Sequence, residues 1–161
     1  MDSGEVLFQN QKIINLPPYE CCRLGIGRTF QVVKTFAKHD ILYNGTVAAL
    51  PRMKRVKEAR ELALEILSFV GLAGKKGHLG GALRLADRKR LEIAKTMATQ
   101  PNLLLLDEVR AGLNPAETEE ALALIRKIRE NGITNFLIEH SMQVLMSLSD
   151  RIVIHYGEKI S

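Results

Sequence analysis

The clearest pattern along the chain is a pair of short, continuously apolar runs that both end in polar residues. Leu103–Leu106 is followed by Asp107 and Glu108, and Phe136–Ile138 is followed by Glu139 and His140. Continuous apolar runs of this length, without alternation, are typical of strands buried on both faces of a parallel sheet. The pattern therefore predicts two buried strands that deliver acids and a histidine at their ends.

A capped helix is predicted between the two runs. Asn114 is a suitable N-cap, Pro115 occupies the first helical position, and Glu117 completes a capping box. Asn131-Gly132 predicts the end of the helix. Strand, helix and strand of these lengths form a βαβ unit with parallel strands and a right-handed crossover. The fold class is predicted to be α/β.

Further elements follow from periodicity and turn residues. Apolar positions recur at spacings of three and four from Arg55 to Val70, which predicts an amphipathic helix. Other helices are expected near Pro17-Pro18, from Arg88 to Thr99 and around Met142–Leu148, short strands at Glu5 to Gln9 and Arg151–Ile154, and a turn at Gly25–Gly27 before an extended segment from Arg28. These elements fill one domain.

Composition narrows the class of protein. The chain has 161 residues, 46% of them hydrophobic and 25% charged, and no apolar stretch of membrane-spanning length, so a soluble cytoplasmic protein is expected. Two adjacent cysteines fit a reducing compartment. The net charge of +5 is concentrated in a few clusters, which suit either solvated helix faces or anionic partners. The clusters are 52–57, Lys75-Lys76, Arg84 and 88–90.

The residues that end the two apolar runs suggest phosphoryl-transfer chemistry. Ligands of open α/β sheets bind at the carboxyl ends of the strands. There, Asp107 could hold Mg²⁺, Glu108 could position a water, and His140 could contact a γ-phosphate. Solvated strand-end acids and a surface histidine are the alternative. The phosphate-cradling pattern G-x-x-x-x-G-K-[ST] does not occur in the 161 residues.

Five segments, taken in order, resemble the ATP-binding subunits of ABC transporters, and most closely those of branched-chain amino acid importers. The segments are Gly25–Gln31, Lys89–Ala94, Leu103–Glu108, Ala111–Pro115 and Leu137–Met142. The resemblance covers nearly the whole chain. It implies an ABC-type ATPase with the P-loop NTPase fold, in which a truncated parallel sheet carries a helical subdomain at about residues 32–85 of a single domain, 1–161.

The resemblance also implies roles for individual residues. Gln31 resembles the Q-loop glutamine, Asp107 the magnesium-holding aspartate, Glu108 the catalytic glutamate, His140 the switch histidine, and Asn114 the D-loop residue where two subunits meet. ATP and Mg²⁺ are the implied cofactors. Transmembrane permease subunits and a second ATPase subunit are the implied partners, at the inner face of the cell membrane, and no nucleic acid is expected.

Two departures from the family pattern change this expectation. Where the family has a small, glycine-containing signature loop, this chain has Arg84, Leu85 and Ala86. Glycine is favoured where a backbone approaches phosphate, so this loop is expected to be impaired, although Arg84 could pair with phosphate in another geometry. Asp2–Val6 resembles the segment that follows the phosphate loop, so the chain is expected to begin after that loop and to lack ATP hydrolysis on its own.

The missing loop has a structural consequence and leaves other functions open. In the family its strand lies inside the sheet, here between the strands at Phe136 and Ile152. Either those strands close up, or the chain is marginally stable and prone to associate. A non-catalytic partner or regulatory module is the alternative function. A nucleic-acid-binding ABC-type protein is a third class, which the basic clusters permit and the importer-like segments disfavour.

Overall fold

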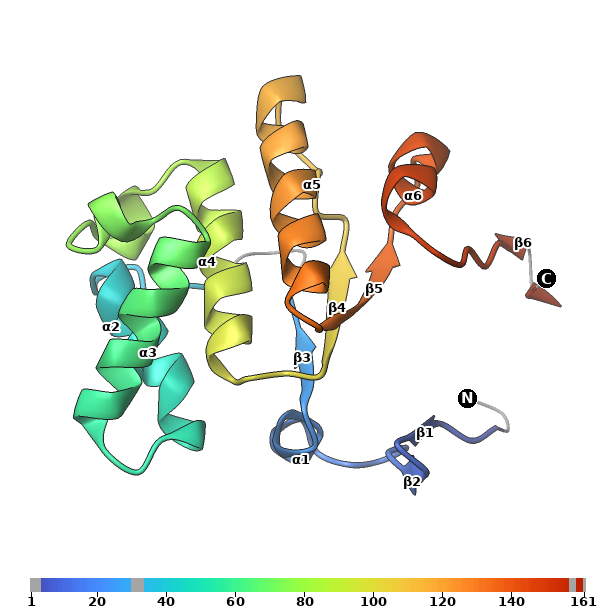
Figure 1. Cartoon of the computed structure of the whole chain (residues 1–161), viewed down its shortest axis with the longest axis horizontal. Helices are drawn as coiled ribbons and strands as arrows, with labels where there is room; N and C mark the ends of the chain where they lie inside the picture. The colour runs from blue at the N-terminus through green and yellow to red at the C-terminus, as the bar shows by residue number, and fades with distance from the viewer. Residues whose placement is uncertain (1–3, 30–33, 157–158, 161) are drawn as a thin grey trace.

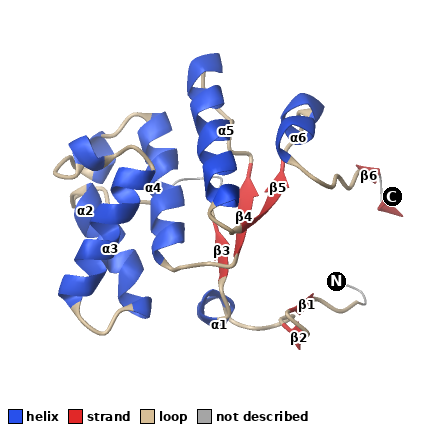
Figure 2. Cartoon of the chain, in the orientation of Figure 1, coloured by secondary structure: helices blue, strands red, loops and turns tan. Residues whose placement is uncertain are grey.

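A three-stranded parallel sheet forms the centre of the protein, with its helices gathered mainly on one side (Figures 1 and 2). The structure, a computed structural model, describes residues 4–29, 34–156 and 159–160. The strands β3 (Ile26–Arg28), β4 (Leu103–Asp107) and β5 (Thr134–Ile138) lie in the order β3-β4-β5. Parallel pairing of β4 with β5 confirms the predicted βαβ unit.

Six α-helices accompany the sheet within the described residues. They are α1 (Pro18–Arg23), α2 (Ile41–Ala49), α3 (Val56–Phe69), α4 (Leu85–Ala98), α5 (Pro115–Glu130) and α6 (Met142–Leu148), with short 3₁₀ turns at Leu50–Arg52, Ala73–Lys75 and Gly80–Ala82. Two antiparallel pairs lie near the ends of the chain: β1 (Leu7–Phe8) with β2 (Gln11–Lys12), and β6 (His155–Tyr156) with β7 (Lys159–Ile160). No described helix combines the length and apolar character that crossing a membrane requires.

The capping signals of α5 are confirmed in full. The Asn114 side chain accepts a hydrogen bond from the Glu117 N–H at 2.9 Å, and the Glu117 carboxylate accepts one from the Asn114 N–H at 3.0 Å. Pro115 is the first helical residue, Asn131 is the C-cap, and Gly132 follows with a φ of 83°. Both ends of this helix are therefore determined by local sequence.

The helix predicted from Arg88 begins three residues earlier, at Leu85. The mixed sequence Leu85-Ala86-Asp87 of its first turn gives no clear local signal for this start. Asp87 of that turn is buried and pairs with the Lys75 ammonium at 2.6 Å, while Leu83 just before the helix is buried. Tertiary contacts, which no local pattern contains, thus extend α4 toward the N-terminus.

Two expectations about the first strands need correction. The predicted short strand at Glu5 to Gln9 is present but confined to Leu7–Phe8, because Gln9 and Asn10 have positive φ and turn the chain into a hairpin. The predicted turn at Gly25–Gly27 contains most of β3. A Cβ at Gly27 would lie 2.6 Å from Thr96 Cγ2, so this glycine allows α4 to approach the strand rather than making a turn.

The predicted strand Arg151–Ile154 is absent, and β5 is therefore an edge strand among the described residues. Val153 and Ile154 are both more than half exposed. Of the two alternatives, closing-up of this segment against the strand at Phe136 does not occur, because residues 151–154 have no strand pairing.

The two faces of the sheet differ sharply in burial. Leu104 and Leu106 point into the main core beneath the helices and are almost fully buried. Phe136 and Ile138 of the neighbouring strand point to the other face and are 57% and 52% exposed. The prediction that the apolar strands are buried on both faces is thus wrong for this part of the chain, in which one face stays open.

Arg52 connects two helices at their C-terminal ends. Its guanidinium donates to the carbonyls of Cys22 and Arg23 at the end of α1, and to the carbonyl of Thr99 after α4. Cations at helix C-termini are stabilising because the last carbonyls lack intrahelical donors. Arg52, grouped by sequence with a surface basic cluster, is therefore a structural link between α1 and α4.

Candidate active site

Asp107 and Glu108 occupy different backbone environments at the end of β4. Asp107 is the last residue of the strand, and Glu108 follows it in the left-handed region, with a φ of 46°. The Glu108 N–H donates to the Ile138 carbonyl at 3.0 Å, which fixes the turn to the end of β5. A non-glycine residue in this conformation is strained, and such strain is concentrated at functional sites.

His140 lies beside Glu108, as parallel strand ends predict. Its Nε2 atom is 3.2 Å from Glu108 Oε1. The register that pairs Asp107 with Ile138 places the residues after both strands at the same edge of the sheet. The imidazole is 81% exposed and the Glu108 side chain 26% exposed, so the pair is open to solvent and to a ligand.

Glu139 lies within this cluster, although sequence reasoning gave it no role. Its side chain is only 3% exposed, and its carboxylate accepts a hydrogen bond from the Arg110 N–H at 3.3 Å. The Arg110 Nε atom is 3.6 Å from the second oxygen. A buried carboxylate requires such partners. Glu139 therefore holds the loop after β4 against the end of β5, a role that the sequence hinted at only through its position beside His140.

Lys89 of α4 is the second residue that sequence reasoning missed. Its Nζ atom donates to the carbonyl oxygens of Glu108 at 3.0 Å and Val109 at 2.9 Å. Burial lowers the pKa of Lys89, and the nearby carboxylates of Glu139 and Glu108 partly oppose this shift. Its place within a run of basic residues indicated a solvated helix face, which is wrong for this member of the run.

Asp107 borders two hollows of different size. A cavity of about 20 Å³ lies among Asp107, Lys89, Thr29, Glu92, Ile93, Leu106 and Val109, enough for about one water. A groove of about 270 Å³ lies over the open sheet face, lined by Asp107, Arg28, Leu105, Leu106, Phe136 and Ile138. The carboxylate is thus placed where the open face meets the interior.

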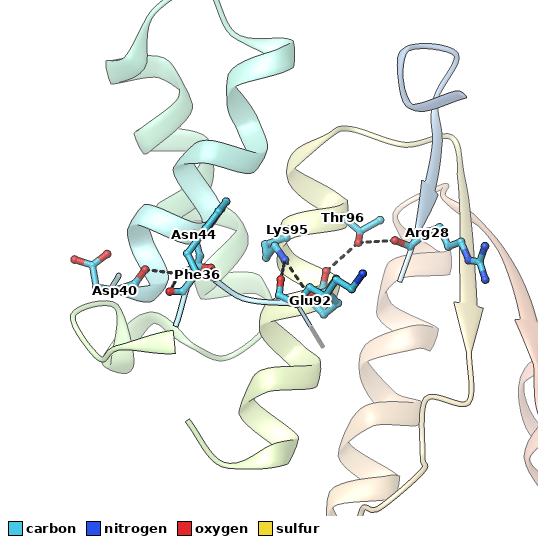
Figure 3. Close-up of polar contacts among 8 residues, drawn as sticks. Arg28, Phe36, Asp40, Asn44, Glu92, Lys95 and Thr96 are labelled. Carbon is cyan, nitrogen blue, oxygen red and sulfur yellow. Dashed lines mark hydrogen bonds and ion pairs between the residues drawn. The ribbon is translucent and has the colours of Figure 1, made fainter. Parts of the chain in front are cut away.

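Gln31 lies outside the described residues. The described residues before and after it contact α4, and those farther along contact α2 (Figure 3). The Thr96 hydroxyl lies 3.4 Å from the Arg28 carbonyl, and the Lys95 ammonium donates to the carbonyl of Lys34. Lys95 also pairs with the buried Glu92 carboxylate at 2.9 Å. Farther along, the Phe36 N–H donates to the buried Asn44 side chain at 2.8 Å.

The remaining predicted site residues lie at the starts of two helices. Arg84 is the N-cap of α4 and makes no side-chain capping bond, and Ala86 is in the first turn. Asn114 caps α5 with its side-chain oxygen, which leaves its amide nitrogen as a donor. The two helix starts are close together, since a Cβ at Gly112 would lie 2.8 Å from Leu85 Cδ2.

The single carboxylate at Asp107 suits Mg²⁺ better than a metal ion that is coordinated entirely by protein side chains. No group of three or more metal-binding side chains occurs in the part of the chain that the structure describes. Mg²⁺ commonly takes one or two carboxylates and completes its shell with waters and phosphate oxygens. Asp107 fits that requirement. The backbone cradle for those phosphates is not matched by any segment of the 161-residue sequence.

Comparison with known proteins decides the family. The sequence model of the family described as "ABC transporter" matches residues 1–111. The chain belongs to the ABC transporter family. It is 39% identical over 167 residues to the high-affinity branched-chain amino acid transport ATP-binding protein BraF of Pseudomonas aeruginosa, covering 94% of this chain. It is 38% identical over 175 residues to the protein of the same description, LivG, of Escherichia coli, covering 98% of this chain.

Solved ATP-binding cassettes have the same fold. The ADP conformation of MJ1267, an ATP-binding cassette of an ABC transporter, superposes with a TM-score of 0.82 at 27% identity over 92% of this chain. The predicted ABC-type, P-loop NTPase fold is thereby confirmed. The chain spans about two thirds of the length of the proteins it matches: 66% of BraF, 69% of LivG and 64% of the MJ1267 chain.

Proposed function

We propose that this chain supplies the carboxylates and the histidine of an ATP-hydrolysing site that drives import of branched-chain amino acids. The observation that carries the proposal is the 3.2 Å contact between Glu108 and His140, directly beside Asp107 at the carboxyl end of the parallel sheet. The names of BraF and LivG, which describe branched-chain amino acid transport and ATP binding, support the choice of cargo.

Each of the three residues has a separate task in this proposal. The Glu108 carboxylate accepts a hydrogen bond from the attacking water and orients it. His140 holds that carboxylate through Nε2 and donates a hydrogen bond to the terminal phosphate when the ligand displaces the contact. Asp107 would hold Mg²⁺, which neutralises charge on the phosphate oxygens when bound. The left-handed turn at Glu108 aims its side chain along the strand edge toward His140.

The partners belong to the proposal as well. A helical subdomain at about residues 32–85 would dock on transmembrane permease subunits at the cytoplasmic face of the membrane. An exposed aromatic cluster supports this, because Phe36 and Tyr43 are 49% and 45% exposed and His39 stacks on Tyr43 at 4.1 Å between ring centroids. A second ATPase subunit would meet the chain near Asn114, with the loop at Arg84 and Ala86 facing the partner's γ-phosphate. Gln31 would lie at the magnesium and couple the site to the membrane subunit. That a solved cassette, MJ0796, is described as dimeric and bound to ADP and Pi supports the expectation of a dimer.

The test compares the 161-residue chain with a chimera that adds a segment carrying G-x-x-x-x-G-K-[ST] before Asp2. The chain alone is expected to show neither micromolar binding of labelled ATP with Mg²⁺ nor turnover, because the β- and γ-phosphates lack their backbone cradle. The chimera is expected to hydrolyse ATP, and Glu108→Gln to lower kcat at least about 100-fold. Equal kcat for the chimera and its Glu108→Gln variant would overturn the role of Glu108.

A non-catalytic partner subunit is the second candidate, and the start of α4 favours it. The positions that form a glycine-containing loop in the family are helical from Leu85 onward. Arg84 is the N-cap residue, and its side chain makes no capping hydrogen bond. Backbone approach to a phosphate is thereby hindered. Co-purification with permease subunits, together with a chimera that folds and binds ATP without hydrolysing it, would favour this candidate over the first.

A further inference from the structure

We infer that Lys89 is a positioning residue that holds the Glu108 turn in its left-handed conformation. The inference rests on the proposed role of Glu108, and it concerns how α4 controls that residue. Lys89 acts on the backbone of the turn, because its Nζ atom donates to the carbonyls of Glu108 and Val109.

The geometry explains what the Lys89 ammonium adds to the turn. The Glu108 carbonyl already accepts the Ala111 N–H at 3.1 Å, and the Glu108 N–H is bonded to the Ile138 carbonyl at 3.0 Å. The left-handed φ at Glu108 directs two successive carbonyls toward α4, where Val109 is buried. A buried carbonyl without a partner costs free energy, and a charged donor forms the stronger class of hydrogen bond. The Lys89 ammonium provides a donor for the Val109 carbonyl and a second donor for the Glu108 carbonyl.

The environment of Lys89 fits this task better than a surface role. Its ammonium borders the small cavity beside Asp107 and is flanked by the Glu139 and Glu108 carboxylates. Glu139 is itself tied to Arg110, two residues beyond Glu108. The turn is thus held by Lys89 through its carbonyls and by Glu139 through the Arg110 N–H. The side chain of Glu108 is left pointing toward His140.

Amide hydrogen exchange of the 161-residue protein, followed by NMR without nucleotide, tests the inference. In Lys89→Met the Glu108 and Ala111 amides are expected to exchange about tenfold faster or more, because their bonds depend on the turn. Lys89→Arg keeps the charge and the donors and is expected to accelerate exchange less than Lys89→Met does. The matched control is Arg88→Met on the exposed side of α4, which is expected to leave both amides unchanged.

A second readout separates positioning from general stability. At fixed pH, the ¹⁵N shift of His140 Nε2 is expected to move in Lys89→Met toward its value in Glu108→Gln, where the carboxylate is lost. The Ile125 amide in the middle of α5 serves as the internal reference for global opening. If Lys89→Met does not fold, Lys89→Gln, which keeps one donor, takes its place with an intermediate acceleration expected.

Three results would overturn the inference. The first is unchanged exchange at Glu108 and Ala111 in the folded variant. The second is equal acceleration in Lys89→Met and Arg88→Met. The third is acceleration at Ile125 as large as at Ala111, which would make Lys89 merely structural. None of these results depends on ATP, so they leave the proposed hydrolysis to be judged by the chimera and its Glu108→Gln variant alone.

Discussion

The two faces of the central sheet both carry large apolar side chains, but their environments are opposite. Leu104 and Leu106 lie in the core under the helices, while Phe136 and Ile138 on the other face are more than half exposed. The covered face contributes the buried area that stabilises the protein. The open face carries Asp107 at its edge. Apolar composition alone therefore does not tell which strand positions hold the fold together.

The largest expected effect comes from the covered face. Leu106→Ala is expected to lower the free energy of unfolding by about 2 to 5 kcal/mol, because it leaves a cavity in the core. Leu105→Ala, one residue away on the open face, is expected to cost less than about 2 kcal/mol, because its side chain is only partly buried. Urea denaturation measures both. Equal losses would contradict the division of the sheet into two unlike faces.

An intermediate effect is expected from α5, a helix that packs against β5. Asn114→Ala removes one half of the capping box and is expected to lower the free energy of unfolding by about 1 kcal/mol. Glu119→Gln, at an exposed position of the same helix, is the matched control, with a change below about 0.5 kcal/mol. Thermal unfolding at neutral pH reports the difference. A harmless Asn114→Ala would show that α5 does not depend on its cap.

The smallest effect on stability, and a clear effect on association, is expected from the open face. Phe136→Thr is expected to change the free energy of unfolding by less than about 0.5 kcal/mol and to reduce self-association, because exposed apolar patches and sheet edges promote it. Tyr19→Thr removes a side chain of similar exposure, 59% against 57%, from α1. Light scattering over a concentration series compares the two. Equal association of both variants and the wild type would rule out the open face as the sticky surface.

Elements with local signals could be predicted from the sequence. The capping residues around Asn114 placed α5 to the residue, and the apolar periodicity from Arg55 to Val70 placed α3 to within one residue at each end. The apolar run at Arg151–Ile154 also predicts a strand, but the strand is absent. A strand forms only beside a pairing partner, and the local sequence does not show whether that partner is present.

In the candidate site too, some residues have local sequence signals and others depend on tertiary contacts. Asp107, Glu108 and His140 could be selected because they follow apolar runs, and the structure brings Glu108 and His140 together. Lys89 and Arg110 could not be selected, because their roles arise from contacts with a backbone turn and a buried carboxylate far along the chain. Local sequence thus marks the residues that could meet a ligand, and tertiary contacts mark those that hold them in place.

The left-handed backbone at Glu108 also bears on how this gene changes over generations. Glycine adopts that conformation without a steric cost, so replacement of Glu108 by glycine relieves the local backbone strain. Relief of that strain favours loss of the glutamate, and a need for its carboxylate opposes that loss. The residue found at position 108 in sister lineages is consequently a record of whether the chemistry at this strand end is still under selection.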